Sequence, residues 1–257
     1  MDELCIVGGL VPSLIIDRAL GGEPETGEQH SGTNDLDVGL AVALLDDAQY
    51  AEISRRLRQE GFAPDVNERG NPTPHRWRLE DLEVTVDFLL PALPDGKRGG
   101  QVQPLEGDFG ALVAPGLELA FEERQEVELE GDTLTGEKAR RRVPVCGPAA
   151  FVVLKALAFA DRSEPKDAYD LIYVLRRWPG GAAEIASRLA EHHRRHSGIV
   201  EQALTGLAND FADPDHVGPR RAASFVAGST EDLDAAAADA HGYVDDLLRA
   251  AGTLGIR

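Results

Sequence analysis

Residues 32–42 read GTNDLDVGLAV and carry the alternation that is typical of a half-buried β-strand. Apolar side chains at every second position face a core, which places Asp35 and Asp37 together on the opposite face. Two carboxylates that project side by side can share one divalent cation. The alternative is a turn that contains two acids, since Asp-x-Asp is a common pattern.

Composition limits the class of protein. The chain has 257 residues, enough for one large domain or two modest ones, and a formal net charge of -19. This charge argues against a broad electrostatic grip on nucleic acid, so any contact with RNA would have to be local. Cys5 and Cys146 provide neither a disulfide framework nor zinc-ligand spacing, so we expect a reducing cytoplasm. The sequence contains no run of about 18 apolar residues, so we expect no membrane span.

A glycine pair lies between the first predicted strand and the first predicted helix. Leu4–Val7 is a short apolar strand, Gly8 and Gly9 follow it, and residues 11–20 have helical spacing. Backbone N–H groups at such a helix start are open to an anion, which suits a triphosphate. The alternative is a tight strand-to-helix turn that needs small residues.

The middle of the chain predicts further strands and one amphipathic helix, over residues 46–61. Residues 82–90 alternate as a strand, with Val84 and Val86 on one face and Asp87 on the other. An acid in such a strand usually needs a partner, and a metal already held by Asp35 and Asp37 would supply one. We also expect a strand or an extended arm over residues 73–79, strands over 118–121, 126–129 and 143–146, and loops over 21–29 and 95–110.

The sequence does not decide the roles of two clusters, one of basic residues and one of histidines. Residues 138–142, KARRR, are the densest basic run, and they form either a solvated hairpin edge or a local contact for RNA. His192 and His196 have the spacing of a helical metal pair, but no glutamate accompanies them in the usual motif. For the two histidines we therefore favour a solvated helix face.

From Gly147 onward the pattern is helical, so we divide the chain into domains 1–146 and 147–257. Lys155 lies among apolar residues of the first of these helices, where snorkelling to the surface is the ordinary explanation. Asp167 and Asp170 lie one turn apart near the start of the next helix, where acids complement the helix dipole. The core stripe predicted for the first helix consists of Phe151, Leu154, Leu157 and Ala158.

Several of these pieces occur in a recognisable order: Gly8-Gly9, HSGTNDLD at 30–37, Asp87, Lys155 and KDAYD at 166–170. As a set they resemble the AbiEii/AbiGii nucleotidyltransferase-like family. Its members include toxins of type IV toxin–antitoxin and abortive-infection systems, with MenT-type toxins among their relatives. The resemblance covers roughly residues 4 to 180.

The resemblance implies an α+β fold, with a nucleotidyltransferase-type mixed sheet and helices followed by a helical C-terminal domain. It implies an enzyme that depends on Mg²⁺ or Mn²⁺ and uses an NTP as substrate. Carried over to this chain, Asp35, Asp37 and Asp87 would bind the metal. Gly8, Gly9, Lys155 and Lys166 would bind the nucleotide, and Asp35, Asp37, Lys155 and Asp170 would serve catalysis. We expect Lys155→Met to cost activity and to change stability little.

The function that follows is transfer of a nucleoside monophosphate from an NTP to an acceptor. We expect the acceptor to be RNA, such as a tRNA end. The protein would act as a toxin and have an antitoxin partner. Two alternatives stay open. A small-molecule nucleotidyltransferase of the antibiotic-modifying type is consistent with the net charge of -19. A non-catalytic nucleotide-binding module is the other.

Overall fold

The computed structural model describes residues 3–17, 30–41, 46–67, 69–93, 97–133, 136–226 and 230–256. The chain folds into two compact units. The first comprises Met1–Val11 and Ser31–Cys146, and the second comprises Pro12–His30 and Gly147–Arg257. The segment Pro12–His30 thus belongs to the second unit although it precedes residue 147. The division into domains at 146/147 stays a prediction, and the loop predicted over 21–29 lies outside the described residues.

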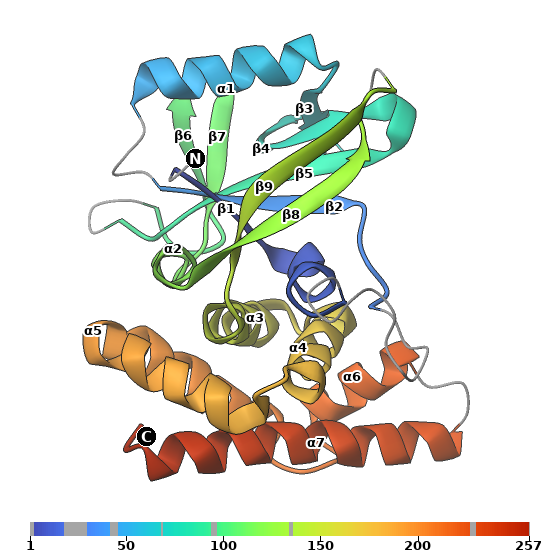
Figure 1. Ribbon diagram of the computed structural model, residues 1–257, viewed down its shortest axis with the longest axis vertical. Helices are drawn as coiled ribbons and strands as arrows, with labels where there is room; N and C mark the ends of the chain where they lie inside the picture. The colour runs from blue at the N-terminus through green and yellow to red at the C-terminus, as the bar shows by residue number, and fades with distance from the viewer. Residues whose placement is uncertain are drawn as a thin grey trace. The chain divides into compact units, whose positions relative to one another are not determined.

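In its described part, the first unit contains a nine-stranded mixed sheet (Figure 1). The strands are β1 (Leu4–Val7), β2 (Asp35–Leu40), β3 (Ala63–Val66), β4 (Pro72–Leu79), β5 (Val84–Leu90), β6 (Val102–Glu106), β7 (Phe109–Val113), β8 (Arg124–Asp132) and β9 (Lys138–Cys146). Seven of them follow the order β3-β4-β5-β2-β1-β9-β8, while β7 pairs with β5 and with β6. The pairs β2–β5, β1–β9 and β5–β7 are parallel, and the other pairs are antiparallel.

The strand predicted from residues 32–42 is β2, which lies between β1 and β5. Val38 and Leu40 are buried in the core, as the alternation predicts, and Asp35 and Asp37 lie on the other face. Strand β5 confirms the prediction for residues 82–90, with a short 3-10 turn at Glu80–Leu82 before it. Two central strands therefore each present one apolar face and one face that carries acids.

Aromatic side chains form the centre of the first unit's core. The Phe109 ring lies 4.8 Å from that of Phe88 and about 6 Å from those of Tyr50 and Trp77, measured between centroids. Tyr50 comes from α1 (Asp47–Gln59), the helix predicted over 46–61, which lies beside β6 and β7 (Figure 1). Asp46 caps this helix by accepting a hydrogen bond from the Gln49 N–H, and so defines its first turn.

Two segments differ from the sequence-based prediction. The strand expected over 118–121 is a helix, α2 (Glu118–Glu122), because the turn after Gly116 starts i→i+3 hydrogen bonding there. The loop expected over 95–110 contains β6 and the start of β7. The glycines and prolines of this segment are typical of loops, so its sequence does not indicate strands. Among the described strands β6 pairs with β7 alone, and a proline is tolerated at such an edge.

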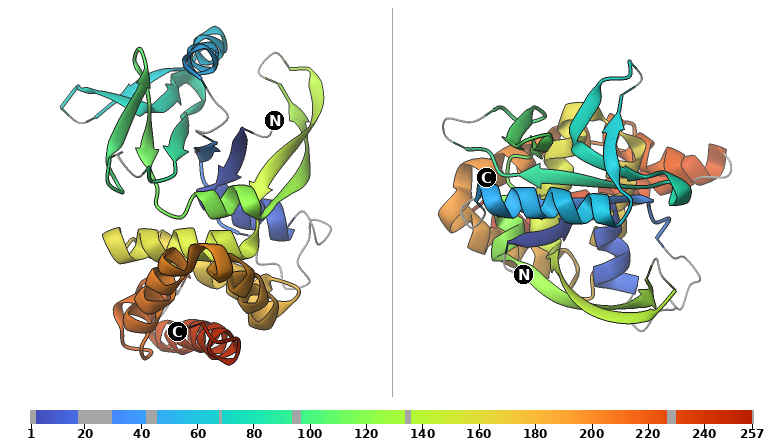
Figure 2. Two further views of the ribbon diagram at one scale, coloured as in Figure 1. Left: turned by 90° about the vertical axis from the view of Figure 1, so that its left-hand side faces the viewer. Right: turned by 90° about the horizontal axis from the view of Figure 1, so that it is seen from above.

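The basic run at 138–142 lies in a long twisted hairpin of β8 and β9 (Figure 2). Lys138 pairs with Asp132 at 2.8 Å, and Arg140 lies 3.3 Å from Glu128. This confirms the hairpin-edge interpretation. The acidic side chains of β8 neutralise much of the basic charge, and the role in binding RNA stays a prediction.

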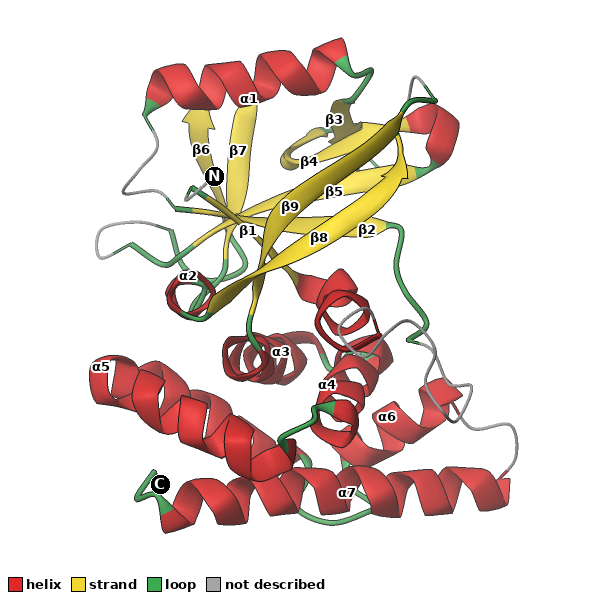
Figure 3. Ribbon diagram, viewed as in Figure 1, coloured by secondary structure: helices red, strands yellow, loops and turns green. Residues whose placement is uncertain are grey.

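The described part of the second unit is built from helices (Figure 3). They are α3 (Pro148–Arg162), α4 (Pro165–Arg177), α5 (Gly181–Asp210), α6 (Val217–Val226) and α7 (Thr230–Thr253), together with a π-helical turn at Ser13–Asp17. The mixed sheet and the C-terminal helices confirm the predicted fold class. Among the described residues, no helix combines the length and the apolar character needed to cross a membrane.

Two predictions for these helices are wrong. In α3 the buried residues include Val152, Lys155 and Phe159 as well as Phe151, whereas the predicted stripe residues 154, 157 and 158 are only half-buried. Helix α3 is apolar on most of its surface, so periodicity alone does not identify its buried face. His192 is 4% exposed and does not lie on a solvated face, and the helix departs from helical geometry at His196.

Candidate active site

Three carboxylates occupy adjacent positions on the polar face of the sheet. In the parallel pair β2–β5, Asp37 lies directly opposite Asp87, and Asp35 lies opposite Thr85. Residues in register on neighbouring strands point to the same face, so Asp35, Asp37 and Asp87 project from one side of the sheet. Asp35 accepts a hydrogen bond from the Thr85 hydroxyl, which holds its carboxylate toward β5.

The glycine pair lies against this row of acids. Gly8 has φ +70°, and a Cβ placed on it would lie 1.8 Å from Oδ2 of Asp37. Gly8 and Gly9 form the first part of a 3-10 turn, Gly8–Leu10, that follows β1 directly. Position 8 thus requires glycine for two reasons. The backbone there is left-handed, and the Asp37 carboxylate occupies the space in which a side chain would lie.

We expect Gly8→Ala to disturb the site more than Gly32→Ala. Both glycines have a positive φ, +70° and +68°, so both substitutions carry a similar backbone strain of about 1 kcal/mol. Only at Gly8 does the new methyl group meet the Asp37 carboxylate, since nothing lies within 4 Å of the corresponding position at Gly32. Thermal melting and Mn²⁺ titration of both variants check this. Equal effects in the two variants would mean that the Gly8–Asp37 contact has no importance.

Asp87 has the partner that its position in the strand demands, and this partner is an arginine. Nε of Arg76 in β4 donates to Oδ1 of Asp87 at 2.6 Å, and its Nη2 donates to Oδ2. Arg76 and Asp87 lie opposite one another in the antiparallel pair β4–β5. Arg76 is not recognisable as this partner in the sequence, because only the strand register shows which residue lies across from Asp87.

The donor chemistry of this face fits a hard divalent cation. Carboxylate oxygens are the ligands that Mg²⁺ and Mn²⁺ prefer, and the three acids lie in neighbouring register positions. Among the described residues, no three His, Cys, Asp or Glu side chains are already grouped as a metal-binding set. The assignment of Asp35, Asp37 and Asp87 as metal ligands stays a prediction.

A second cluster of charges lies inside the helical unit, around Lys155. The Lys155 ammonium donates to Oδ1 of Asp167 and pairs with Oδ2 of Asp170, each at 2.8 Å. The side chains of the three residues are 8%, 3% and 0% exposed. Lys155 therefore does not snorkel to the surface. It bridges two buried acids, Asp167 and Asp170. In the sequence, the helix dipole was one explanation for the position of these acids.

Further partners complete this cluster. Arg162 donates from Nη2 to Asp167 at 2.8 Å, and Lys166 lies 3.0 Å from Asp170. Nε2 of His30 lies 2.8 Å from Oδ1 of Asp170, and Nδ1 of His30 lies 3.2 Å from the Ser13 hydroxyl. Three cationic side chains thus surround two carboxylates. His30 and Asp170 are 140 positions apart, and no local pattern in the sequence indicates their contact.

The pKa values of this cluster follow from burial opposed by opposite charges. Burial raises the pKa of Asp170, but His30, Lys155 and Lys166 outweigh it and lower that pKa to about 2. Burial also raises the pKa of Asp167, and Arg162 and Lys155 bring it below the ordinary value. Burial disfavours the ammonium of Lys155, yet the two acids raise its pKa. All three groups are therefore ionised at neutral pH.

We expect the free energy of unfolding to fall as the pH decreases from 3.8, the ordinary pKa of aspartic acid, toward about 2. Over this window the unfolded chain binds protons that the folded chain does not, because the pKa of Asp170 is lower in the folded state. Urea unfolding as a function of pH measures the effect. Asp170→Asn should show a shallower dependence, and an unchanged slope in this variant would contradict the assignment.

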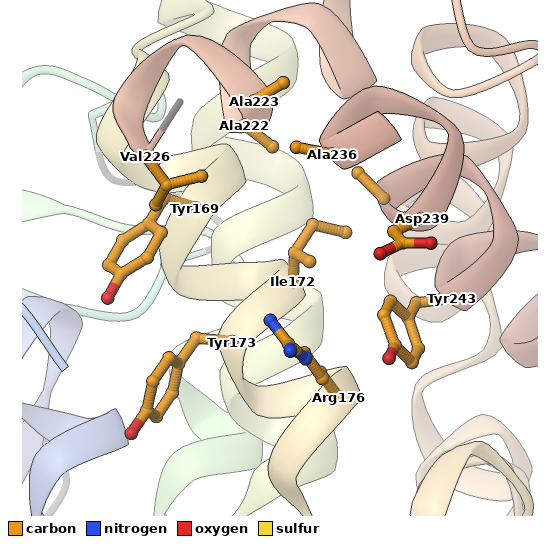
Figure 4. A pocket seen from close by; sticks show the side chains of 11 residues that line it. Tyr169, Ile172, Tyr173, Arg176, Ala222, Ala223, Val226, Ala236, Asp239 and Tyr243 are labelled. Atoms are coloured by element: carbon orange, nitrogen blue, oxygen red, sulfur yellow. The ribbon is translucent and has the colours of Figure 1, made fainter. Parts of the chain in front are cut away.

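A cavity of about 400 Å³ lies between α4, α6 and α7 of the same unit (Figure 4). Tyr173 and Arg176 of α4 line it, with Asp239 and Tyr243 of α7 and small side chains of α6. Tyr169 also borders it, but its ring stacks on both His30 and Phe225, at centroid distances of 5.2 and 4.5 Å. The sequence analysis did not predict this cavity.

The predicted site residues lie in both of the compact units. Gly8, Gly9, Asp35, Asp37 and Asp87 belong to the first unit, where the sheet brings them together. Lys155, Lys166 and Asp170 belong to the second unit, where they form one hydrogen-bonded cluster. Their roles in binding nucleotide and in catalysis stay predictions.

This chain is similar to a solved structure and matches the sequence model of a protein family. The chain is similar to a solved structure, the solution structure of the antibiotic-resistance factor ANT(2'')-Ia, with a TM-score of 0.37 and 12% identity over 77% of this chain and 85% of that chain. It matches none of the curated proteins with which it was compared. The sequence model of the nucleotidyl transferase AbiEii toxin family, type IV toxin–antitoxin system, matches residues 33–250. This match confirms the resemblance, and the chain belongs to the AbiEii family of nucleotidyl transferase toxins.

Proposed function

We propose that this protein transfers a nucleoside monophosphate from an NTP to an RNA acceptor, such as the end of a tRNA, and that the transfer depends on Mg²⁺ or Mn²⁺. The observation that carries the proposal is the row of Asp35, Asp37 and Asp87 beside the Gly8–Gly9 turn. A glycine turn at a strand end next to paired acids is suited to a nucleotide and its metal.

In this proposal the acids and the glycines have different tasks. The metal, when bound, would polarise the α-phosphate and balance the charge of the pyrophosphate that leaves. Asp35 and Asp37 would hold it from β2, and Asp87 would hold it from β5. Gly8 and Gly9 would offer backbone N–H groups to the phosphates, because neither has a side chain of its own to keep a phosphate from the peptide. Rigid strands on both sides keep the carboxylates in place for the reaction.

The family indicates the biological setting. The AbiEii description names a toxin of a type IV toxin–antitoxin system, so we infer that an antitoxin is encoded as a partner. The basic run at 138–142 is the candidate for a local RNA contact, although pairing with acidic residues of β8 reduces its charge.

A small-molecule nucleotidyltransferase is the second candidate, and the net charge of -19 favours it. A cationic acceptor would be attracted to such a protein, whereas the phosphates of RNA would be repelled from most of its surface. The two candidates share the acid row and differ only in the acceptor.

One assay separates these functions. Each of the four NTPs, labelled at the α-phosphate, is incubated with the protein, Mg²⁺ and either total tRNA or a polycationic aminoglycoside. Label in the tRNA supports the proposal, and label in the small molecule supports the second candidate. Asp35→Asn/Asp37→Asn should abolish either transfer. No transfer to any acceptor, despite NTP binding, would leave a non-catalytic nucleotide-binding protein.

A further inference from the structure

We propose that Arg76 is an exchangeable counter-ion of Asp87. It holds this carboxylate while no metal is bound, and it leaves the carboxylate when a divalent cation enters the row of Asp35, Asp37 and Asp87. The inference rests on the metal site of the proposed function, but it concerns cation binding and does not depend on the acceptor.

The geometry shows competition for the same atoms. Both oxygens of Asp87 accept hydrogen bonds from the Arg76 guanidinium, one from Nε at 2.6 Å and the other from Nη2. On its other side Asp87 lies opposite Asp37. Arg76, Asp87 and Asp37 therefore follow one another across β4, β5 and β2, on the face opposite to the buried Trp77.

The Arg76 guanidinium pairs with Asp87, and Asp37 and Asp35 lie on the neighbouring strand β2. A divalent cation that binds the three acids supplies the charge that Arg76 now provides, and it repels Arg76. The bidentate fork on both oxygens of Asp87 competes with a metal for the negative charge and the orientation of this carboxylate.

The exposure of Arg76 makes this exchange feasible. Its side chain is 39% exposed, whereas that of Asp87 is 12% exposed. A half-exposed guanidinium regains water when it leaves, while the less exposed carboxylate needs a replacement partner. The arginine is thus the mobile member of the pair, and the metal is the replacement.

Arg78 offers a matched control on the same strand and the same face. It lies two residues from Arg76, its side chain is 38% exposed, and it is opposite Thr85. Its ion pair is with Glu80 at 3.0 Å. Replacing Arg78 removes one positive charge from the same face of the sheet, across Thr85 from Asp35, and leaves Asp87 in its pair with Arg76.

The test is calorimetric titration of the full chain with Mn²⁺ alone. Arg76→Gln should bind Mn²⁺ about five- to tenfold more tightly than the wild type, because the competing cation is gone. Arg78→Gln should change the affinity less than about twofold. In an Asp87→Asn background, Arg76→Gln should have no further effect, since both act through the same carboxylate.

Three results would overturn the inference. Equal Mn²⁺ affinities of wild type and Arg76→Gln would show no competition, and weaker binding would mean that Arg76 orients Asp87 for the metal. If Arg76→Gln and Arg78→Gln increased the Mn²⁺ affinity equally, the increase would come from long-range charge and not from competition for Asp87. If Arg76→Gln fails to fold by thermal melting, Arg76→Lys keeps the charge without the fork, and it must show an intermediate gain. Failure of the transfer assay leaves these Mn²⁺ results unaffected, so the two proposals fail separately.

Discussion

Replacing Lys155 by methionine should lower the free energy of unfolding by about 3 kcal/mol, because it leaves two buried acids without their shared cation. Lys155 is within 2.8 Å of Asp167 and of Asp170, and both carboxylates are almost fully buried. Methionine fills a similar volume, so lost packing contributes little. From the sequence we expected a small change in stability, and the buried pairing of Lys155 reverses that expectation.

Lys166→Met is the control for this prediction. Lys166 also contacts Asp170, at 3.0 Å, but its side chain is 34% exposed. An exposed pair contributes much less than a buried one, so this variant should lose less than about 1 kcal/mol. Urea unfolding of both variants gives the comparison. A Lys155→Met protein as stable as the wild type would contradict the inference that Lys155 neutralises the buried acids.

Urea unfolding, combined with the transfer assay, decides how Lys155 affects transfer. If activity and stability decline together, and Lys155→Met/Asp167→Asn recovers both, the lysine acts on the reaction through the fold of the helical unit. A folded Lys155→Met protein that transfers nucleotide about ten- to a hundredfold more slowly would support the phosphate contact implied by the family.

Asp37→Asn should reduce nucleotide transfer by about a hundredfold or more, with little loss of stability. The amide keeps the size of the carboxylate and its place beside Gly8, but it removes the charge that a divalent cation needs. Asp35→Asn should have a similar effect, since the two acids share one face of β2. Transfer assays and Mn²⁺ titrations are run in parallel with thermal melting.

Asp65→Asn is the control for these acid substitutions. Asp65 lies in β3, an acid of the same sheet on a strand that pairs with β4 and not with β2 or β5. Its replacement should leave transfer and Mn²⁺ affinity within about twofold of the wild type. A fully active Asp37→Asn protein would remove the acid row from the proposed site.

Local patterns in the sequence were sufficient for part of this protein. The alternation of β2 and β5, the amphipathic helix α1 and the helical character of most described residues after Gly147 follow from periodicity, which a short segment carries by itself. Asp35, Asp37 and Asp87 were likewise recognisable as acids on the polar faces of strands, because a strand's two faces are defined by neighbours in the chain.

The tertiary structure decided the partners of these acids and the burial of Lys155. Strand register places Arg76 across from Asp87, and folding brings His30 to Asp170 from 140 positions away. Both contacts depend on which elements meet, and a linear pattern does not contain that information. A lysine among apolar residues reads the same whether it snorkels or is buried, because only the packed neighbours supply the carboxylates that make burial possible.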